Sequence, residues 1–258
     1  MIGYILRRLL GVIPVLLGVS LVVFLAMQLV PGDIAKALLG PLATQESVEE
    51  FRRYLGLDQP VLVQYWKWLG HALRGDLGLS FSSNMPVSQL LSERLRNSGI
   101  LLLGSLIIAI PLGIAIGLFS AIRRDSRFDR WSMGLMLVLA NIPTFVFGLG
   151  LILIFSVKLR WFPVQGMYDM RGDGGRFDLI RHLVLPALTT AIPPAAIIAR
   201  MVRSAMLDTL NQEYTKAARA NGLPENTVTL TYALRNALPP IITISGLQVG
   251  FLLGGSVF

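Results

Sequence analysis

Cysteine is absent from this 258-residue chain, and histidine occurs only twice, as His71 and His182. The first absence excludes disulfides, thiolate metal sites and cysteine catalysis. Neither histidine has a paired ligand at a metal-binding spacing, so a structural or solvated role is favoured over a metal site. Charged residues are also scarce, since they make up 15% of the chain against 53% hydrophobic residues. This composition is typical of an integral membrane protein and not of a soluble domain with a large core.

Long stretches of the chain contain no charge at all. Five such apolar runs cover approximately residues 9–30, 99–122, 131–157, 183–199 and 241–258. A helix needs about 20 apolar residues to cross a bilayer, and the first three runs meet that length. The fourth is shorter and broken by prolines, but it continues into Arg200, whose long side chain can reach the membrane surface. The fifth stops at Phe258 without a polar flank, and we expect a further C-terminal portion. The sequence predicts an all-α polytopic membrane protein.

The missing charges also limit the chemistry. No acid or histidine lies within the five runs, so no Ser-His-Asp arrangement can form inside the membrane. Gly70 and Gly75 have the spacing of a phosphate-binding loop, but Asp76-Leu77 occupies the positions where lysine and serine or threonine are required. We therefore reject an enzyme. An ion-coupled secondary transporter or a channel subunit is kept as the alternative, although carriers usually need an ionisable residue at membrane depth.

Basic residues outnumber acidic ones by 23 to 15. They are scattered between hydrophobic runs and form no arginine-rich helix, so we expect no nucleic-acid partner. Arg7 and Arg8 precede the first run and predict a cytoplasmic N-terminus, with a retained transmembrane helix within residues 1–30 and not a cleaved signal peptide. Alternating spans then place residues 200–240 in the cytoplasm and residues 31–98 outside.

Residues 31–98 have the pattern of a small helical extracytoplasmic cap. Ser47 and Glu50 have capping-box spacing, and Gly56 suits the end of the helix that they begin. A second helix is predicted from Pro60 to Arg74, and one of its faces carries Val61, Tyr65, Trp68, Leu69 and Ala72. We expect the cap to pack against the outer ends of the spans, and direct contact with a solute is the alternative.

Residues 99–258 would form the membrane core, in which a few residues interrupt the apolar runs. Proline removes a backbone hydrogen bond and kinks a helix. Amide side chains within a span either line a pathway or satisfy a neighbouring helix. The candidate pathway or hinge residues are Asn141, Pro143, Pro193, Pro194 and Gln248.

The segment 213–240 is polar, within an otherwise apolar chain, and its pattern predicts two helices that meet at a corner. Gly222 suits the left-handed residue that ends a helix, and Pro224 can open the next helix because a first turn does not need its missing N–H. Ala217 and Ala218 would leave the surface before this corner bare, so that another protein could approach the backbone. A stiff amphipathic lever is predicted to lead to the corner through Val202, Met206, Leu210, Tyr214 and Ala217. Spacing alone leaves open whether the corner docks a soluble protein or is an ordinary helical hairpin loop.

Ala217-Ala218 with Gly222 after them resembles the EAA loop of the membrane permeases of bacterial binding-protein-dependent ABC importers. The flanks of this loop are most similar to those of the dipeptide, oligopeptide, glutathione and nickel permease subfamily. Landmarks elsewhere support the same resemblance, namely Pro31-Gly32-Asp33, Gly56-Leu57-Asp58-Gln59-Pro60 and Gly75-Asp76-Leu77-Gly78-Leu79-Ser80. The resemblance implies the type I ABC importer transmembrane fold and a multi-pass location in the bacterial inner membrane.

As partners, the resemblance implies a second related permease, two ABC ATPase subunits and an extracytoplasmic substrate-binding protein. ATP and Mg²⁺ would bind to the ATPase subunits, so this chain would hold no cofactor or metal of its own. The residues implied in ATPase coupling are Glu213, Tyr214, Lys216, Ala217, Ala218, Arg219, Gly222, Leu223 and Pro224. Lys216 departs from the generic loop signature, which has a glutamate there. The solute stays open among peptides, glutathione, nickel chelates and sugars, with a peptide as the first choice.

Overall fold

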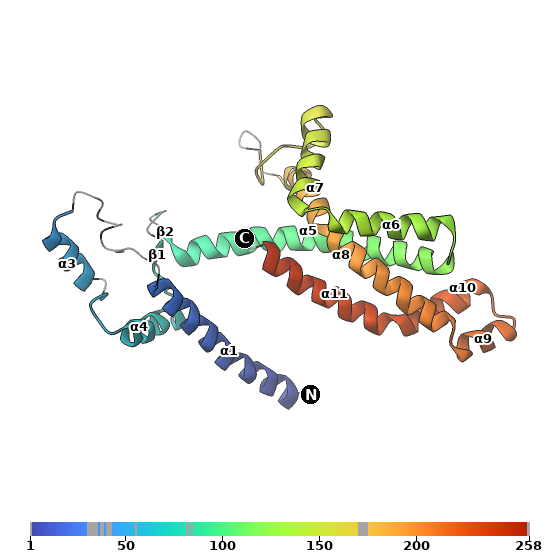
Figure 1. Ribbon diagram of the computed structural model, residues 1–258, viewed down its shortest axis with the longest axis horizontal. Helices are drawn as coiled ribbons and strands as arrows, with labels where there is room; N and C mark the ends of the chain where they lie inside the picture. The colour runs from blue at the N-terminus through green and yellow to red at the C-terminus, as the bar shows by residue number, and fades with distance from the viewer. Residues whose placement is uncertain are drawn as a thin grey trace. The chain divides into compact units, whose positions relative to one another are not determined.

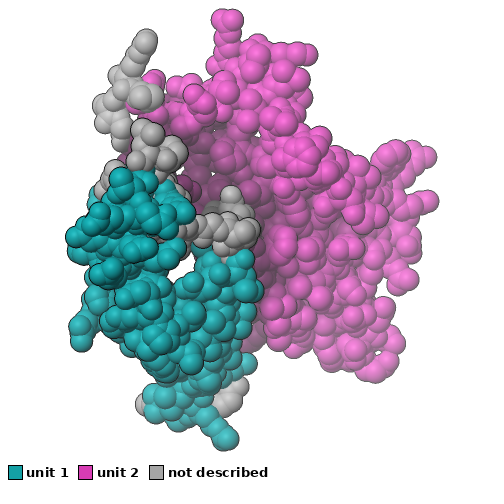
Figure 2. All heavy atoms as spheres, turned by 60° about the vertical axis from the view of Figure 1, so that its left-hand side comes forward, with its two compact units in different colours: residues 1–93 teal, residues 94–258 magenta. Residues whose placement is uncertain are grey.

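The computed structural model describes residues 2–29, 36, 39, 43–54, 56–80, 83, 85–169 and 175–256, and nearly all of its regular structure is helical (Figure 1). The chain divides into two compact units, residues 1–93 and 94–258 (Figure 2). Among the described residues, four helices are long and apolar enough to cross a membrane, or five spans result if one bent helix pair counts as a span. The prediction of an all-α polytopic membrane protein is confirmed. The motif Pro31-Gly32-Asp33 and the terminal Phe258 lie outside the described residues.

Unit 1 is organised around the contact between α1 (Ile2–Gln28) and α4 (Val61–Leu73). Tyr65 of α4 is only 3% exposed, and its hydroxyl oxygen lies 2.9 Å from Ser20 Oγ of α1. The Tyr65 ring also meets Phe24 edge to face, with ring centroids 5.5 Å apart. The most buried residue of the predicted apolar face therefore holds α4 on α1.

The two helices predicted between the first and second spans are both present. The first, α3 (Gln45–Tyr54), begins earlier than predicted, because Thr44 Oγ1 accepts the backbone N–H of Ser47 at 3.3 Å and takes the capping position. The expected capping role of Ser47 is therefore wrong. Gly56 follows this helix at φ +68°, which confirms its predicted role as a helix end. A short antiparallel hairpin of β1 (Leu79–Ser80) and β2 (Met85–Pro86) comes after α4.

Unit 2 is built on the close crossing of α5 (Val87–Ile122), whose residues 94–122 belong to this unit, and α8 (Arg176–Leu210). A Cβ atom added to Gly113 would lie 2.8 Å from the Ala195 carbonyl oxygen, too close for any other residue type without a shift. Small residues let the backbones of membrane helices approach in this way. The small residues at the crossing are Ser105, Ala109, Gly113 and Gly117 on α5 and Ala191, Ala195 and Ala199 on α8.

The predicted third span is broken rather than kinked. It consists of α6 (Arg127–Asn141) and α7 (Thr144–Leu151), which continues as the π-helix η1 (Ile152–Lys158). The two parts are bent by 103° (Figure 1). Pro143 stands at the break and has no N–H for a hydrogen bond to the preceding turn, so α6 ends before it. A sequence pattern predicts that proline interrupts a helix, but it does not predict the angle between the two parts.

Helix α8 runs without interruption for 35 residues although it contains Pro186, Pro193 and Pro194. At 1.5 Å per residue it is about 52 Å long, whereas the hydrocarbon core is about 30 Å thick. The short, proline-broken fourth span expected over residues 183–199 is therefore the middle of a longer helix that projects from the membrane. The second half of α8 packs with α11 (Arg235–Ser256), and the core between them contains Ile198, Val202, Ala205, Met206, Ala237 and Ile241.

Candidate functional site

Helix α9 (Glu213–Ala220) follows α8 after a two-residue break. It ends in a Schellman motif, in which the N–H of Leu223 donates to the Ala218 carbonyl at 3.3 Å and the N–H of Gly222 donates to the Arg219 carbonyl at 2.9 Å. Gly222 has φ +75°, the left-handed conformation that this motif requires. The predicted helix end at Gly222 is confirmed.

After Pro224 the chain enters α10 (Glu225–Thr227), which continues as the π-helix η2 (Val228–Leu234) into α11. An ion pair closes the corner, since Arg219 Nη2 lies 2.7 Å and Nε 3.1 Å from the two carboxylate oxygens of Glu225. Its hydrogen bonds to Glu225 raise the pKa of Arg219 above the ordinary value. The two side chains are 39% and 60% exposed, so this pair contributes little to stability. It joins the last turn of α9 to the start of α10 across the corner.

Thr215 fixes the angle between α9 and α8. Its side chain is fully buried, and its Oγ1 lies 2.6 Å from the Gln212 carbonyl, 2.9 Å from that of Leu210 and 3.1 Å from that of Thr209. A hydroxyl has one proton to donate, so the carbonyl oxygens of the last two residues of α8 and of Gln212 share this donor. Sequence reasoning missed Thr215, and the only available signal was a lone threonine among alanines and charges.

The corner exposes most of the residues implied in coupling. Glu213 and Lys216 form an exposed pair, with Oε1 and Nζ 2.8 Å apart. Ala217 is exposed, whereas Ala218 is only 5% exposed. The bare surface expected at both alanines therefore exists at Ala217 alone, because Ala218 faces the interior of the protein. The exposed members of the set are Glu213, Tyr214, Lys216, Ala217, Arg219, Gly222, Leu223 and Pro224.

The predicted lever is not one continuous helix. Val202 and Met206 have no exposed surface and belong to the core between α8 and α11. The helix then ends at Leu210, while Tyr214 lies on the separate helix α9 and is 40% exposed. The residues at this spacing therefore belong to two helices, one buried in the core and one exposed, and the hydrogen bonds of Thr215 connect the two.

A buried ion pair lies near the same end of α8. Asp129 of α6 is 2% exposed, and Arg203 of α8 donates to its carboxylate through Nε and Nη2, each at 2.6 Å. The backbone N–H of Asp125 donates to Asp129 Oδ2 at 3.0 Å, and Ser126 Oγ caps α6 by accepting the Asp129 N–H at 3.2 Å. Asp129 was not singled out from the sequence. Its position three residues after a capping serine was the available signal.

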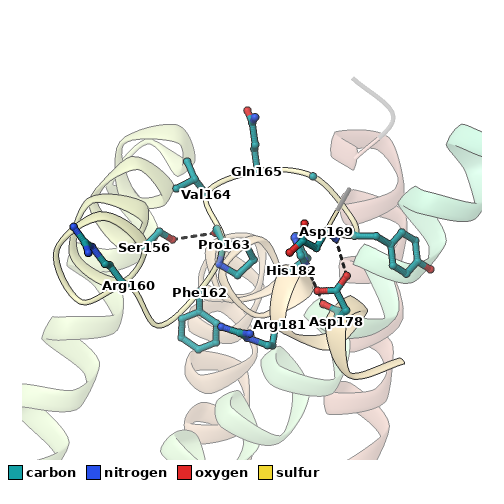
Figure 3. A pocket seen from close by; sticks show the side chains of 12 residues that line it. Ser156, Arg160, Phe162, Pro163, Val164, Gln165, Asp169, Asp178, Arg181 and His182 are labelled. Atoms are coloured by element: carbon teal, nitrogen blue, oxygen red, sulfur yellow. Dashed lines mark hydrogen bonds and ion pairs between the residues drawn. The ribbon is translucent and has the colours of Figure 1, made fainter. Parts of the chain in front are cut away.

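The opposite end of α8 carries a cavity of about 760 Å³ (Figure 3). Its wall is the loop after η1 together with the first turns of α8. Asp178 Oδ2 accepts the backbone N–H of Asp169 at 2.7 Å, and Arg181 Nη2 donates to the Trp161 carbonyl at 3.2 Å. These bonds fasten the loop to α8. The residues lining the cavity are Ser156, Arg160, Phe162, Pro163, Val164, Gln165, Gly166, Tyr168, Asp169, Asp178, Arg181 and His182.

His182 is a structural residue within this wall. Its side chain is 6% exposed, and its Nδ1 lies 2.9 Å from the carbonyl oxygen of Asp178 and 3.2 Å from Asp178 Oδ1. A second cavity of about 330 Å³ shares residues 163–166 and His182 with the first and is also lined by Thr189 and Thr190. The two cavities therefore lead from the loop toward the middle of α8.

The candidate pathway or hinge residues lie on several different helices. Asn141 is the last residue of α6, where its Nδ2 donates to the Leu137 carbonyl at 2.7 Å, and Pro143 stands in the break before α7. Pro193 and Pro194 lie inside α8, and Gln248 of α11 is 6% exposed. Within the described part of the chain, Gln248 Oε1 has no hydrogen-bond partner and no cluster of residues could hold a metal ion.

Comparisons with known proteins match the whole length of the chain. Residues 113–258 match the family described as the binding-protein-dependent transport system inner membrane component, and residues 1–101 match the N-terminal family of such membrane components. The chain is 42% identical to the glutathione transport system permease protein GsiC of Salmonella paratyphi A over all of this chain and 81% of that protein. The chain is 40% identical to GsiC of Escherichia coli K12, again over all of this chain and 81% of that protein.

Proposed function

Because the chain belongs to the family of inner-membrane components of binding-protein-dependent transport systems, we propose that it pairs with a second permease to form the pathway of an ATP-driven importer for a glutathione-like peptide. It is a permease subunit of an ABC importer and not an enzyme. In this proposal two ATPase subunits bind ATP and Mg²⁺, and a binding protein delivers the solute. The peptide-like solute is inferred from the relatives, which are glutathione permeases by name.

The observation that carries the proposal is an exposed helix held at a fixed angle. The ATPase docks on the exposed residues of α9 and on the turn from Gly222 to Pro224. Because Thr215 connects α9 to the end of α8, a displacement of α9 is passed to α8 and not absorbed by a flexible loop. Energy then reaches the pathway as a difference in contacts between two conformations.

This assignment places the α9 corner and the N-terminus in the cytoplasm, and the cavity at the other end of α8 on the outer side. Solute leaves the binding protein on that side and enters the cavity beside Arg181 and Gln165. Its volume, about 760 Å³, lies within the usual range of small-molecule sites. From there the solute would pass into the second cavity, which is lined by Thr189 and Thr190.

The test is purification of the tagged chain from its native membrane in mild detergent, followed by identification of every co-purifying subunit. Recovery of ATPase subunits and a second permease, with MgATP-dependent uptake of glutathione or a peptide after reconstitution, is the expected result. A chain that moves solute in vesicles without ATP and without those subunits contradicts the proposal and restores the secondary transporter or channel.

A further inference from the structure

We propose that Asp129 and Arg203 are positioning residues that make α6 move together with α8 when the ATPase subunits displace α9. The inference rests on the proposed function, since it requires an ATP-driven partner at α9. Neither side chain is assigned any contact with solute or nucleotide. Their effect is exerted through the helices that they join.

The geometry of this pair resists sliding. Both terminal oxygens of Asp129 accept an Arg203 N–H at 2.6 Å, and Oδ2 also accepts the N–H of Asp125. A bidentate pair between a guanidinium and a carboxylate fixes orientation as well as distance, whereas apolar contacts between helices can shift. A second contact holds the same region, because Ser132 Oγ of α6 lies 2.9 Å from Ser120 Oγ of α5.

The pair also lies at the point where a displacement would be transmitted. Arg203 is seven residues before the end of α8 at Leu210, and Thr215 ties that end to α9. Asp129 lies in the first turn of α6, whose other end is the 103° break at Pro143. A continuous chain of contacts therefore runs from α9 through α8 and α6 to the broken span. At this break the direction of the span changes by 103°.

A purely stabilising role predicts a different outcome. A buried ion pair often contributes little net stability, yet removal of one partner leaves an uncompensated charge. If the pair only stabilises the fold, its variants should lose folded protein and transport in proportion. If it positions α6, the assembled importer should keep hydrolysing ATP while it moves less solute for each ATP.

Distance measurements test the movement itself. The chain has no cysteine, so introduced cysteines carry the only spin labels on it. The label positions are Leu135 on α6, Ser204 on α8 and Leu149 on α7, all of which are exposed. The variants are Leu135→Cys, Ser204→Cys and Leu149→Cys. In the complete reconstituted importer, we expect the 135–204 distance to stay constant between the ATP-free and ATP-bound states and the 135–149 distance to change. A 135–204 distance that changes with ATP in the otherwise unmodified chain overturns the proposal.

Asp129→Asn should lower the solute moved per ATP by about tenfold and let the 135–204 distance vary with ATP, because the charge-assisted link is lost. Asp125→Asn is the control for loss of a neighbouring negative charge: the backbone N–H that donates to Asp129 Oδ2 is kept, asparagine tolerates the φ of +60° at this position, and only an exposed side-chain pair with Arg124 is removed. It should retain full coupling. Arg203→Lys keeps the positive charge but loses the bidentate geometry, so its solute moved per ATP should lie between the values of Asp129→Asn and Asp125→Asn. This variant also tests the proposal if Asp129→Asn does not assemble.

Unchanged coupling in both Asp129→Asn and Arg203→Lys contradicts the inference. So does a loss of solute uptake that merely follows the amount of assembled protein. A failure of the proposed function is distinguishable, because the unmodified chain and Asp125→Asn would then show no ATP-driven uptake at all.

Discussion

The two ends of α8 differ in what they hold. At the α9 end, Thr215 and the pair of Asp129 and Arg203 fasten whole helices to α8. At the other end, Asp178 fastens a loop that forms the wall of a cavity. Fixed helices can transmit a displacement, and a loop over a cavity can adjust around a solute. We therefore expect damage at the first end to separate ATP hydrolysis from transport and damage at the second to change solute uptake or stability without changing coupling.

The largest effect is expected from Gly222→Val. Nothing lies within 4 Å of a Cβ at this position, so the cost is backbone strain at φ +75° and not a clash. A β-branched residue is unfavourable there by about 1–3 kcal/mol, enough to displace the corner and reduce solute-stimulated ATPase activity by about tenfold or more. Membrane insertion should be unaffected. Gly222→Asn, which tolerates this conformation, is the control, and an equal loss with both variants would exclude strain as the cause.

Thr215→Val should have the next largest effect. It keeps the shape of the side chain but removes the hydroxyl that donates to these carbonyl oxygens, at a cost of about 1–3 kcal/mol. We expect a several-fold lower transport per ATP, measured in vesicles. Thr215→Ser restores the hydroxyl and should restore coupling, and a valine variant with normal coupling would show that the angle of α9 is fixed by other contacts.

Asp178→Ala tests the end of α8 that carries the loop and the cavity. It removes the acceptor for the Asp169 N–H and one partner of His182, so the free energy of unfolding should fall by about 1–3 kcal/mol. The apparent solute affinity in uptake assays should weaken while the ATP consumed per solute stays constant. Asp178→Asn keeps an acceptor oxygen and should be milder. A change in coupling as large as that of Thr215→Val would remove the distinction between the two ends.

Glu225→Gln should have the smallest effect. The carboxylate and its partner Arg219 are largely exposed, and such pairs contribute about 0.2–1 kcal/mol. Coupling should remain within about twofold of the unmodified chain, as measured by solute-stimulated ATPase activity. A tenfold loss would mean that this ion pair, and not Thr215, carries the geometry of the corner.

Local patterns predicted the helix ends well because glycine and proline act on the backbone where they stand. Gly56 and Gly222 both adopt the left-handed conformation expected of them. The apolar runs predicted the membrane class for a similar reason, since the length of a run must match the bilayer. By contrast, the 103° break at Pro143 and the unbroken α8 depend on packing against other helices, which single-sequence patterns do not contain.

The ion pair of Asp129 and Arg203 was missed because its two residues are far apart in the chain. Arg203 meets Asp129 across 74 positions, and no spacing rule relates them. Ala218 was expected on the surface because alanine at that spacing is small, but the direction that it faces depends on where α9 rests. Sequence therefore located the corner, while the structure was needed to show which of its residues face outward.

The most direct test of the central claim is site-specific cross-linking at the two ends of α8. A photo-reactive label on Ala217→Cys at the exposed face of α9 is compared with one on Phe177→Cys, which replaces a residue that is 74% exposed at the start of α8. In native membranes we expect position 217 to capture an ATPase subunit and position 177 not to do so. Capture of the ATPase subunit from position 177, or from neither position while ATP-driven uptake is intact, would contradict the account.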